Sequence, residues 1–300
     1  MSAQPLRPLI FGEVLFDHFP DGSSVLGGAP FNVAWHLQAF GLSPLLISRV
    51  GNDVAGQQVR TSMLQWGMDV SGLQCDETHP TGRVEVSFSQ GEPHYEIVEQ
   101  CAYDFIDAGG LPDLAEAPWL LYHGSLALRQ STSTLMRIRQ QTGAARFLDI
   151  NLRTPWWSQD LLQPLLQQAH WIKLNSDELQ QLLPDIDNEE ARITAVMQHK
   201  PDYVLLTRGA RGATAICADG TRYTVQPGEK AALVDTVGAG DAFCSVMIAG
   251  LVRRWPVPLT LSRAQAFASA MVGIRGATTD NREFYNNMIA LWQQEESQDV

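Results

Sequence analysis

Short apolar runs alternate with amphipathic stretches along most of the chain. Each run ends in polar residues or glycine, as strands buried on both faces commonly do. The stretches at 31–41 and 54–67 have helical spacing and close on Gly41 and Gly67. This alternation predicts an α/β fold with a mainly parallel central sheet flanked by helices on both faces. Strands are expected at 9–16, 45–51, 119–124, 145–150, 170–175 and 203–209, with two further helices at 264–274 and 282–296.

Between residues 82 and 106 the pattern changes to alternating apolar and polar residues. The alternation on either side of Gln90–Pro93 predicts a small antiparallel hairpin with one face in water. No linker, charge block or repeat marks a boundary, so we expect a single domain over 1–300, with lid elements at about 13–20 and 82–106. The apolar face of the hairpin would carry Val84, Val86, Phe88, Tyr95 and Ile97, and Glu96, Glu99 and Asp104 would make its edge acidic.

Composition narrows the classes of function. A net charge of −12 without a Lys/Arg stripe argues against a nucleic-acid partner, because nothing would neutralise the phosphates. No apolar run approaches the ~20 residues that cross a bilayer, and the N-terminal apolar stretch is too short for a signal peptide. We therefore expect a cytoplasmic protein with no membrane partner. Four cysteines without paired spacing do not indicate a zinc site.

Polar residues follow several of the predicted strands. In open parallel sheets, ligands bind at the carboxyl ends of the strands, so these side chains are candidates for a binding site. They are Asp17, Asn151, Arg153, Asn175, Glu178, Thr207 and Gly209.

The stretch DTVGAGDAF (235–243) places glycines and two aspartates ahead of an apolar helix. Glycines before a helix let its unpaired N–H groups approach an anion such as phosphate. Asp241 would then face a hydroxyl that attacks this anion and would take its proton. The alternative is that Asp241 is an N-cap, and spacing alone favours neither. The stretch is neither a P-loop nor a dinucleotide fingerprint.

DTVGAGDAF resembles the C-terminal signature DTxGAGD of the ribokinase/PfkB family of carbohydrate kinases. Further likenesses follow the family's order over about residues 9–280. They are GGAPFNVAWHLQAFG (27–41), RVGNDVAGQQV after it, NSDE (175–178) for NxxE, and TRGARGA (207–213) for TxGxxG.

This resemblance implies an ATP-dependent kinase and gives roles to individual residues. Asp241 would be the base, and the amides of Gly238, Ala239 and Gly240 would form an anion hole. Asp235 and the Val237 carbonyl would bind a monovalent cation such as K+. Asn175 would contact the phosphates, and Glu178 would hold Mg2+ through water, which suits the oxygen ligands that Mg2+ prefers. Thr207, Gly209 and Gly212 would contact the nucleotide. Without the family, Ser176, Asp177 and Glu178 would be helix-capping residues, and the glycines would form a β-turn between two strands.

The sugar site follows from the same resemblance. Asp17 would accept hydrogen bonds from two hydroxyls, and Gly28 and Asn32 would contact the substrate. DINLRTPWW (149–157) is similar to the fructokinase and 2-keto-3-deoxygluconate kinase branches, so Asn151 and Arg153 would reach the sugar. For Asp17 and Arg153, the alternatives are a solvated loop residue and a surface salt bridge.

Three features bear on the substrate. Ala29 stands where ribokinases typically carry lysine, HGSLAL (123–128) resembles fructokinases, and the acidic hairpin fits a neutral sugar better than an anionic one. Fructose is therefore expected. The alternatives are a kinase for 2-keto-3-deoxygluconate, ribose or another sugar, or a nucleoside, and a catalytically silent sugar sensor. The apolar hairpin face could form a homodimer through the lid or could simply cover the site.

Overall fold

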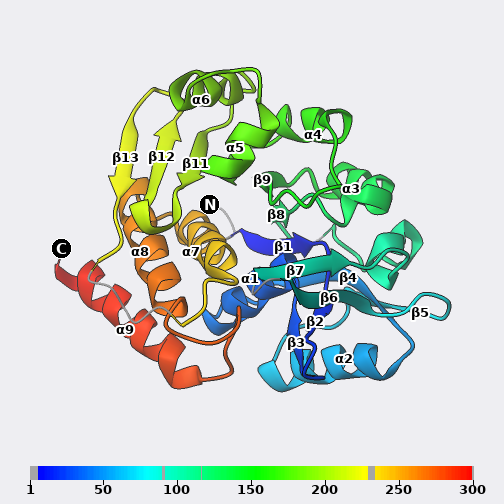
Figure 1. Ribbon diagram of the computed structural model, residues 1–300. Coiled ribbons are helices and arrows are strands. Elements are labelled where there is room, and N and C mark those ends of the chain that lie inside the picture. Colours follow the sequence, from blue (N-terminus) through cyan, green and yellow to red (C-terminus); the bar gives the residue numbers. More distant parts are fainter. Residues whose placement is uncertain (1–5, 90–91, 116, 229–233, 299–300) are drawn as a thin grey trace.

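The fold is built on one long central sheet. The computed structural model describes residues 6–89, 92–115, 117–228 and 234–298. Within them, nine strands form this sheet, and the strands from β11 to β5 are parallel (Figure 1). Its order is β13 (Arg222–Val225), β12 (Ala213–Cys217), β11 (Tyr203–Thr207), β10 (Trp171–Asn175), β9 (Ala145–Asp149), β8 (Trp119–His123), β1 (Arg7–Phe11), β4 (Leu45–Gly51) and β5 (Leu73–Asp76). The predicted mainly parallel sheet is confirmed, with β12 and β13 added as an antiparallel extension.

Helices cover both faces of this sheet, and each face has its own apolar core. One core contains residues of α1 (Ala29–Ala39), α2 (Val54–Trp66), α7 (Ala239–Arg253), α8 (Val257–Met271) and α9 (Arg282–Gln298). The other contains residues of α3 (Leu128–Thr142), α4 (Gln159–Leu166), α5 (Ser176–Leu182) and α6 (Glu189–Met197). In the described part of the chain, no helix combines the length and apolar character that crossing a membrane would require.

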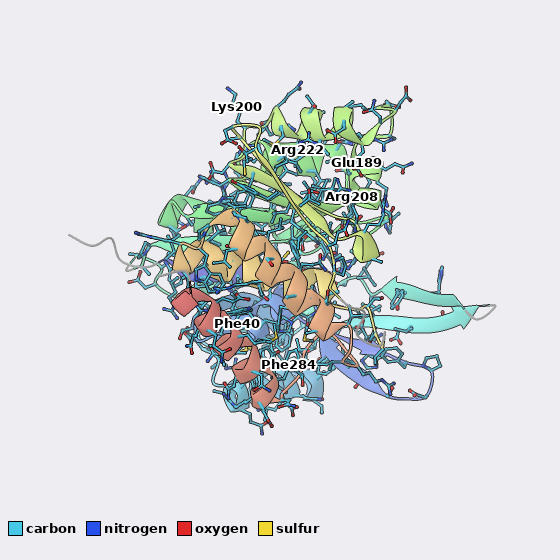
Figure 2. The ribbon with its side chains drawn as sticks, turned by 90° about the vertical axis from the view of Figure 1, so that its left-hand side faces the viewer. Phe40, Glu189, Lys200, Arg208, Arg222 and Phe284 are labelled. Carbon is cyan, nitrogen blue, oxygen red and sulfur yellow. The ribbon has the colours of Figure 1, made fainter. Side chains whose placement is uncertain are left out.

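A second sheet of four strands forms the lid. Its order is β3 (Ser24–Gly27), β2 (Leu15–His18), β6 (Gly82–Ser89) and β7 (Glu92–Ile97). Figure 2 shows the cyan β6–β7 hairpin projecting from the body of the molecule. The lid is mixed rather than wholly antiparallel, because β2 runs parallel to β6. The single strand expected at 9–16 is therefore wrong, since the chain leaves the central sheet after Phe11 and joins the lid at Leu15.

Gly12 makes this change of sheet possible. Its φ of 150° is one that residues with a side chain rarely adopt, and an added Cβ would collide with the Pro30 ring. Apolar character alone did not reveal the break, because residues on both sides of it are buried.

The apolar face of the hairpin lies largely against its own chain. Val84 and Val86 are buried and Ile97 packs against a core, whereas Tyr95 is exposed. Gln90, Gly91 and the side chain of Phe88 lie outside the described residues. A dimer through the lid stays a prediction.

Asp104 does not belong to the acidic edge predicted for the hairpin. It lies in a short 3-10 helix, η1 (Ala102–Phe105), where its carboxylate is buried and pairs with Arg129 of α3 at 2.6 Å. Burying an acidic side chain is costly unless a charge compensates it, and the Arg129 guanidinium does so. Glu96 and Glu99 remain exposed on the hairpin, as predicted.

Candidate active site

Most of the predicted site residues lie at the carboxyl ends of the central strands. Asn175 and Thr207 end β10 and β11 and are direct neighbours in the strand register. Asp17 lies in the lid strand that follows β1, and Asn151 and Arg153 follow β9. β1 lies between β4 and β8, so successive crossovers turn in opposite directions there, and such a point commonly opens a ligand crevice.

The glycine turn before α7 has the geometry of an anion site. Gly238 is the N-cap residue of α7 in the left-handed region, with φ 76°, and the cap makes no side-chain hydrogen bond. Asp241 lies in the first helical turn, so the alternative that Asp241 is the N-cap is wrong. An added Cβ at Gly238 would collide with Ala277. No side chain therefore caps the first amides of α7 next to Asp241, and the Ala239 amide makes only a long bond of 3.3 Å to the Thr236 carbonyl.

Asp241 is held by the helix that carries the first glycine motif. Asn32 Nδ2 donates a hydrogen bond to Asp241 Oδ2 at 2.8 Å, although the two residues are 209 positions apart in the chain. Burial raises the pKa of Asp241 to about 6, and the Asn32 hydrogen bond opposes this rise. Asp149 raises this pKa further, whereas Lys173 and Arg153 lower it. Asp241 is therefore mostly ionised at neutral pH and can accept a proton.

A small group of oxygen acceptors lies beside Gly27. A Cβ built on Gly27 would lie 3.8 Å from Asp17 Oδ2 and 3.9 Å from Asn32 Oδ1. Asn32 Oδ1 is buried and has no hydrogen-bond partner, so it is free to accept from a ligand hydroxyl. Gly28 is the N-cap residue of α1 with φ 106°, and a Cβ there would lie 2.8 Å from the Glu13 carbonyl oxygen. Asp17, Gly28 and Asn32 are thus brought together as predicted.

Arg153 faces this group from the segment after β9. It lowers the pKa of Asp17, Glu13 and Asp241, in each case against the rise caused by burial. Arg153 Nη1 donates a hydrogen bond to the Leu152 carbonyl at 3.3 Å, and among the described residues no surface carboxylate forms an ion pair with it. Asn151 adopts φ 38° and accepts a bond from Ser125 through its carbonyl oxygen. This placement favours the interpretation of Arg153 as a cleft residue.

Asn175 and Glu178 form the capping box of α5. Asn175 Oδ1 accepts from the Glu178 amide at 2.8 Å, and Glu178 Oε2 accepts from the Asn175 amide at 2.7 Å. Glu178 Oε1 also accepts from the amide of Leu152 at 3.1 Å, so the buried carboxylate ties α5 to the segment after β9. Both oxygens keep lone pairs for water, as a magnesium ligand acting through water requires. The capping role and the predicted metal role are compatible.

Thr207, Gly209 and Gly212 lie in the connection between β11 and β12. Gly209 and Gly212 have φ of 54° and 86°, and an added Cβ at Gly212 would collide with the Val225 carbonyl. These glycines therefore do form the turn considered as an alternative. Arg208, inside the motif, points away to Glu189 of α6 and binds its Oε1 at 2.9 Å (Figure 2). This ion pair anchors the turn.

Asp235 organises the loop before the glycine turn. Its Oδ1 accepts from the Val237 amide at 3.0 Å, and its Oδ2 accepts from the Gly276 amide at 3.0 Å. The carboxylate thereby joins the loop to the segment that also packs against Gly238. Residues 229–233, just before the loop, lie outside the described residues.

The sequence interpretation missed three charged residues near Asp241. Lys173 and Asp149 are register partners on β10 and β9, and their side chains pair at 2.9 Å. A partial signal existed, because Lys173 lies between apolar residues in WIKLN and Asp149 directly follows Phe147 and Leu148. Glu13 is also buried, and its Oε2 has no partner; burial raises its pKa to about 7.

Residues 10–283 match the pfkB family carbohydrate kinases. The chain belongs to this family. It is therefore a sugar phosphotransferase, and the predicted family and enzyme class are confirmed.

Curated relatives in the pfkB family include two bacterial fructokinases. That of Klebsiella pneumoniae is 32% identical over 260 residues, covering 81% of this chain and 83% of the relative. That of Salmonella typhimurium is 29% identical over 292 residues, covering 90% and 94%.

Solved structures show the same fold. The fructokinase of Xylella fastidiosa with bound ATP has a TM-score of 0.84 at 22% identity, covering 97% of this chain and 99% of that one. The fructokinase of Vibrio cholerae O395 with fructose, ADP and calcium has a TM-score of 0.81 at 23% identity, covering 92% and 96%. At these identities the two structures support the fold alone.

Proposed function

We propose that this chain transfers the γ-phosphoryl group of ATP to a primary hydroxyl of a neutral sugar, with fructose as the substrate. The observation that carries the proposal is the Asn32–Asp241 hydrogen bond of 2.8 Å. It joins the oxygen acceptors beside Gly27, suited to sugar hydroxyls, to a carboxylate at the glycine turn, suited to phosphate. The fructokinase relatives at 29–32% identity support fructose. We take the whole chain as one kinase domain with lid elements at about 13–20 and 82–106.

The reaction needs few groups from the protein. The sugar hydroxyl oxygen forms a bond to the γ-phosphorus while the bond from that phosphorus to the ADP oxygen breaks. Asp241 accepts the hydroxyl proton and later releases it to water. The amides of Gly238, Ala239 and Gly240 face the charge on the transferring group. Asp17 and Asn32 Oδ1 orient the sugar by accepting from its other hydroxyls.

The metals of the proposal fit the oxygen donors present. Mg2+ bound with ATP would neutralise phosphate charge, and Glu178 would hold it through water. Mg2+ prefers oxygen ligands and keeps several waters, so one carboxylate that acts through water is chemically adequate. For K+, we keep Asp235 and the Val237 carbonyl as ligands. Asp235 already fixes the loop through two amides, so K+ would add to an ordered site.

The deciding experiment replaces Asp241 with Asn. We expect D241N to lower kcat by about a hundredfold or more, because a positioned base contributes about that much. Fructose binding, measured by isothermal titration calorimetry, should stay within a few-fold because Asn keeps the shape of the side chain. Near-normal kcat in D241N would show that Asp241 is not the base. The coupled assay for ADP also tests for a silent sensor, which would release none.

Substrate choice needs a separate panel. Fructose, 2-keto-3-deoxygluconate, ribose, adenosine and aminoimidazole riboside are each added with a non-hydrolysable ATP analogue, and the thermal midpoint is measured. A ligand at a hundredfold its Kd stabilises by about 2.7 kcal/mol, or about 4 °C for a chain of 300 residues. Aminoimidazole riboside is included because a Salmonella enterica kinase bound to it shares the fold. Stabilisation by a nucleoside and not by fructose would overturn our substrate.

A further inference from the structure

A buried ion pair lies directly against the glycine turn. Lys173 Nζ lies 3.3 Å from the position a Cβ would take on Gly240, the residue before Asp241. The same Nζ pairs with Asp149 Oδ1 at 2.9 Å, and the two residues are 5% and 0% exposed. No role was predicted for either residue. The backbone hydrogen bonds of the turn, from Ala239 to Thr236 and from Ala242 to Gly238, involve neither of them.

The sheet dictates that these two side chains face α7. Ile172 and Leu174 point into the core on the α3–α6 face, so Lys173 between them points the other way. Asp149 follows Leu148 and points to the same side as its register partner. The pair therefore fills the space between the sheet and the first turns of α7.

The second oxygen of Asp149 fixes the pair further. Asp149 Oδ2 accepts from Tyr122 Oη at 3.3 Å and from Cys244 Sγ at 3.4 Å. Cys244 lies one helical turn after Asp241, so the contact ties the pair to α7. Burial alone would lower the pKa of Lys173, but the Asp149 carboxylate reverses this and raises it. The lysine thus stays charged although it is buried.

We propose that Lys173, held by Asp149, is a positioning residue of the kinase. Its ammonium group supports the Gly238–Gly240 turn from inside the protein and supplies a fixed positive charge behind the transferring phosphoryl group. The inference rests on the proposed function, because it takes Asp241 as the base and the glycine turn as the anion hole. Lys173 acts through the turn and does not touch the substrate.

The pair also acts on the base. Asp149 raises the pKa of Asp241 and Lys173 lowers it, both less strongly than burial does. Removing the Asp149 charge should therefore lower the pKa of Asp241, and removing the Lys173 charge should raise it. The titratable and charged groups facing Asp241 are Glu13, Tyr122, Asp149, Arg153, Lys173 and Cys244.

The first test removes both charges with K173M/D149N, so that no unpaired charge stays buried. Replacing a whole buried pair is often nearly neutral for stability, whereas breaking one is costly. We expect kcat with fructose and MgATP to fall about tenfold, less than the loss on removing a direct oxyanion donor, while the KM for fructose changes less than threefold. A folded K173M/D149N enzyme with full kcat would refute the inference, because a merely structural pair predicts that result.

The second test is the pH profile of D149N. Because Asp149 raises the pKa of Asp241 and Glu178 still faces Lys173 in this variant, the acid limb of kcat/KM for fructose should move down by about one pH unit. In K173M/D149N the midpoint should return close to that of the wild type. An unmoved midpoint in D149N would contradict the inference.

A matched control neutralises the other buried pair in R129M/D104N. Arg129 and Asp104 pair at 2.6 Å and are as buried, but neither faces Asp241. This variant should leave the midpoint where it is in the wild type, and an equal shift would overturn the inference. The two proposals fail differently. Normal turnover in D241N would refute the assignment of Asp241 as the base. An inactive D241N together with a fully active K173M/D149N would refute only the role of Lys173.

Discussion

Glu13→Gln should stabilise the protein at neutral and alkaline pH. Glu13 follows β1, is 3% exposed, and has an oxygen without a hydrogen-bond partner. Burial raises its pKa from 4.5 to about 7, a shift worth about 3 kcal/mol, and its own backbone hydrogen bond and Arg153 only partly oppose this rise. Gln is neutral at every pH and close in shape to protonated Glu, so the substitution removes the cost of ionising this carboxyl.

The direction of the change in stability with pH follows from the number of protons bound by the folded and the unfolded chain. Between pH 4.5 and about 7 the folded protein holds the Glu13 proton and the unfolded chain does not, so unfolding releases a proton. Stability therefore falls as pH rises through this window and levels off above it. In E13Q this contribution should be absent. The two proteins should be equally stable near pH 4, and E13Q more stable by about 3 kcal/mol at pH 8.

Differential scanning calorimetry from pH 4 to 8.5 measures this difference. Unfolding entropy near 2.1 cal/mol/K per residue converts about 3 kcal/mol into about 5 °C for 300 residues. Asp241 contributes a slope of the same sign, because its pKa is also raised, so the comparison must be with wild type at each pH. If E13Q melts no higher than wild type at pH 8, then Glu13 is not held protonated by burial.

Two further predictions concern the glycine turn and the base. The acid limb of kcat/KM should have its midpoint near pH 6, since Asp241 must lose its proton to act and burial raises its pKa to about 6; a midpoint near 4, measured by the coupled ADP assay, would contradict this. Gly238→Ala should lower kcat at least tenfold and cost about 1–3 kcal/mol, because its φ of 76° is strained for alanine and the new Cβ meets Ala277. The matched control is Gly143→Ala, which has φ 58° and open space around it and should keep full kcat.

Much of the fold follows from hydrophobic periodicity. The strands β4, β8, β9, β10 and β11 lie within a residue or two of the predicted runs, because buried parallel strands are continuous apolar segments. The short strands β3, β5, β12 and β13 were not predicted. β3 and β13 are partly exposed and therefore carry a weak apolar signal. The change of sheet at Gly12 was hidden because both sheets bury their residues there.

Sequence analysis predicted the site residues that belong to local motifs. It missed those whose role depends on a partner from a distant part of the chain. Asp241, Asn32 and Asp17 lie together as the family motifs imply, although chemistry alone left the cap alternative open for Asp241. Lys173 and Asp149 were missed because their meaning depends on which strands are neighbours. Asp104 was wrongly placed on an acidic edge for the same reason, since its partner Arg129 lies 25 residues away on another helix.

The parallel pairing of β2 with β6 sets a rule for engineering substrate preference. The lid cannot be exchanged as one continuous segment. Its strands come from two segments, 15–27 and 82–97, and elements of the central fold lie between them in the chain. A chimera that exchanged only the β6–β7 hairpin would keep Asp17 on the original β2 strand. The β6 strand of the other protein would then have to pair with this unchanged β2. To transfer the substrate preference of another sugar kinase to this chain, both segments must therefore be exchanged together, so that the β2–β6 pairing is kept.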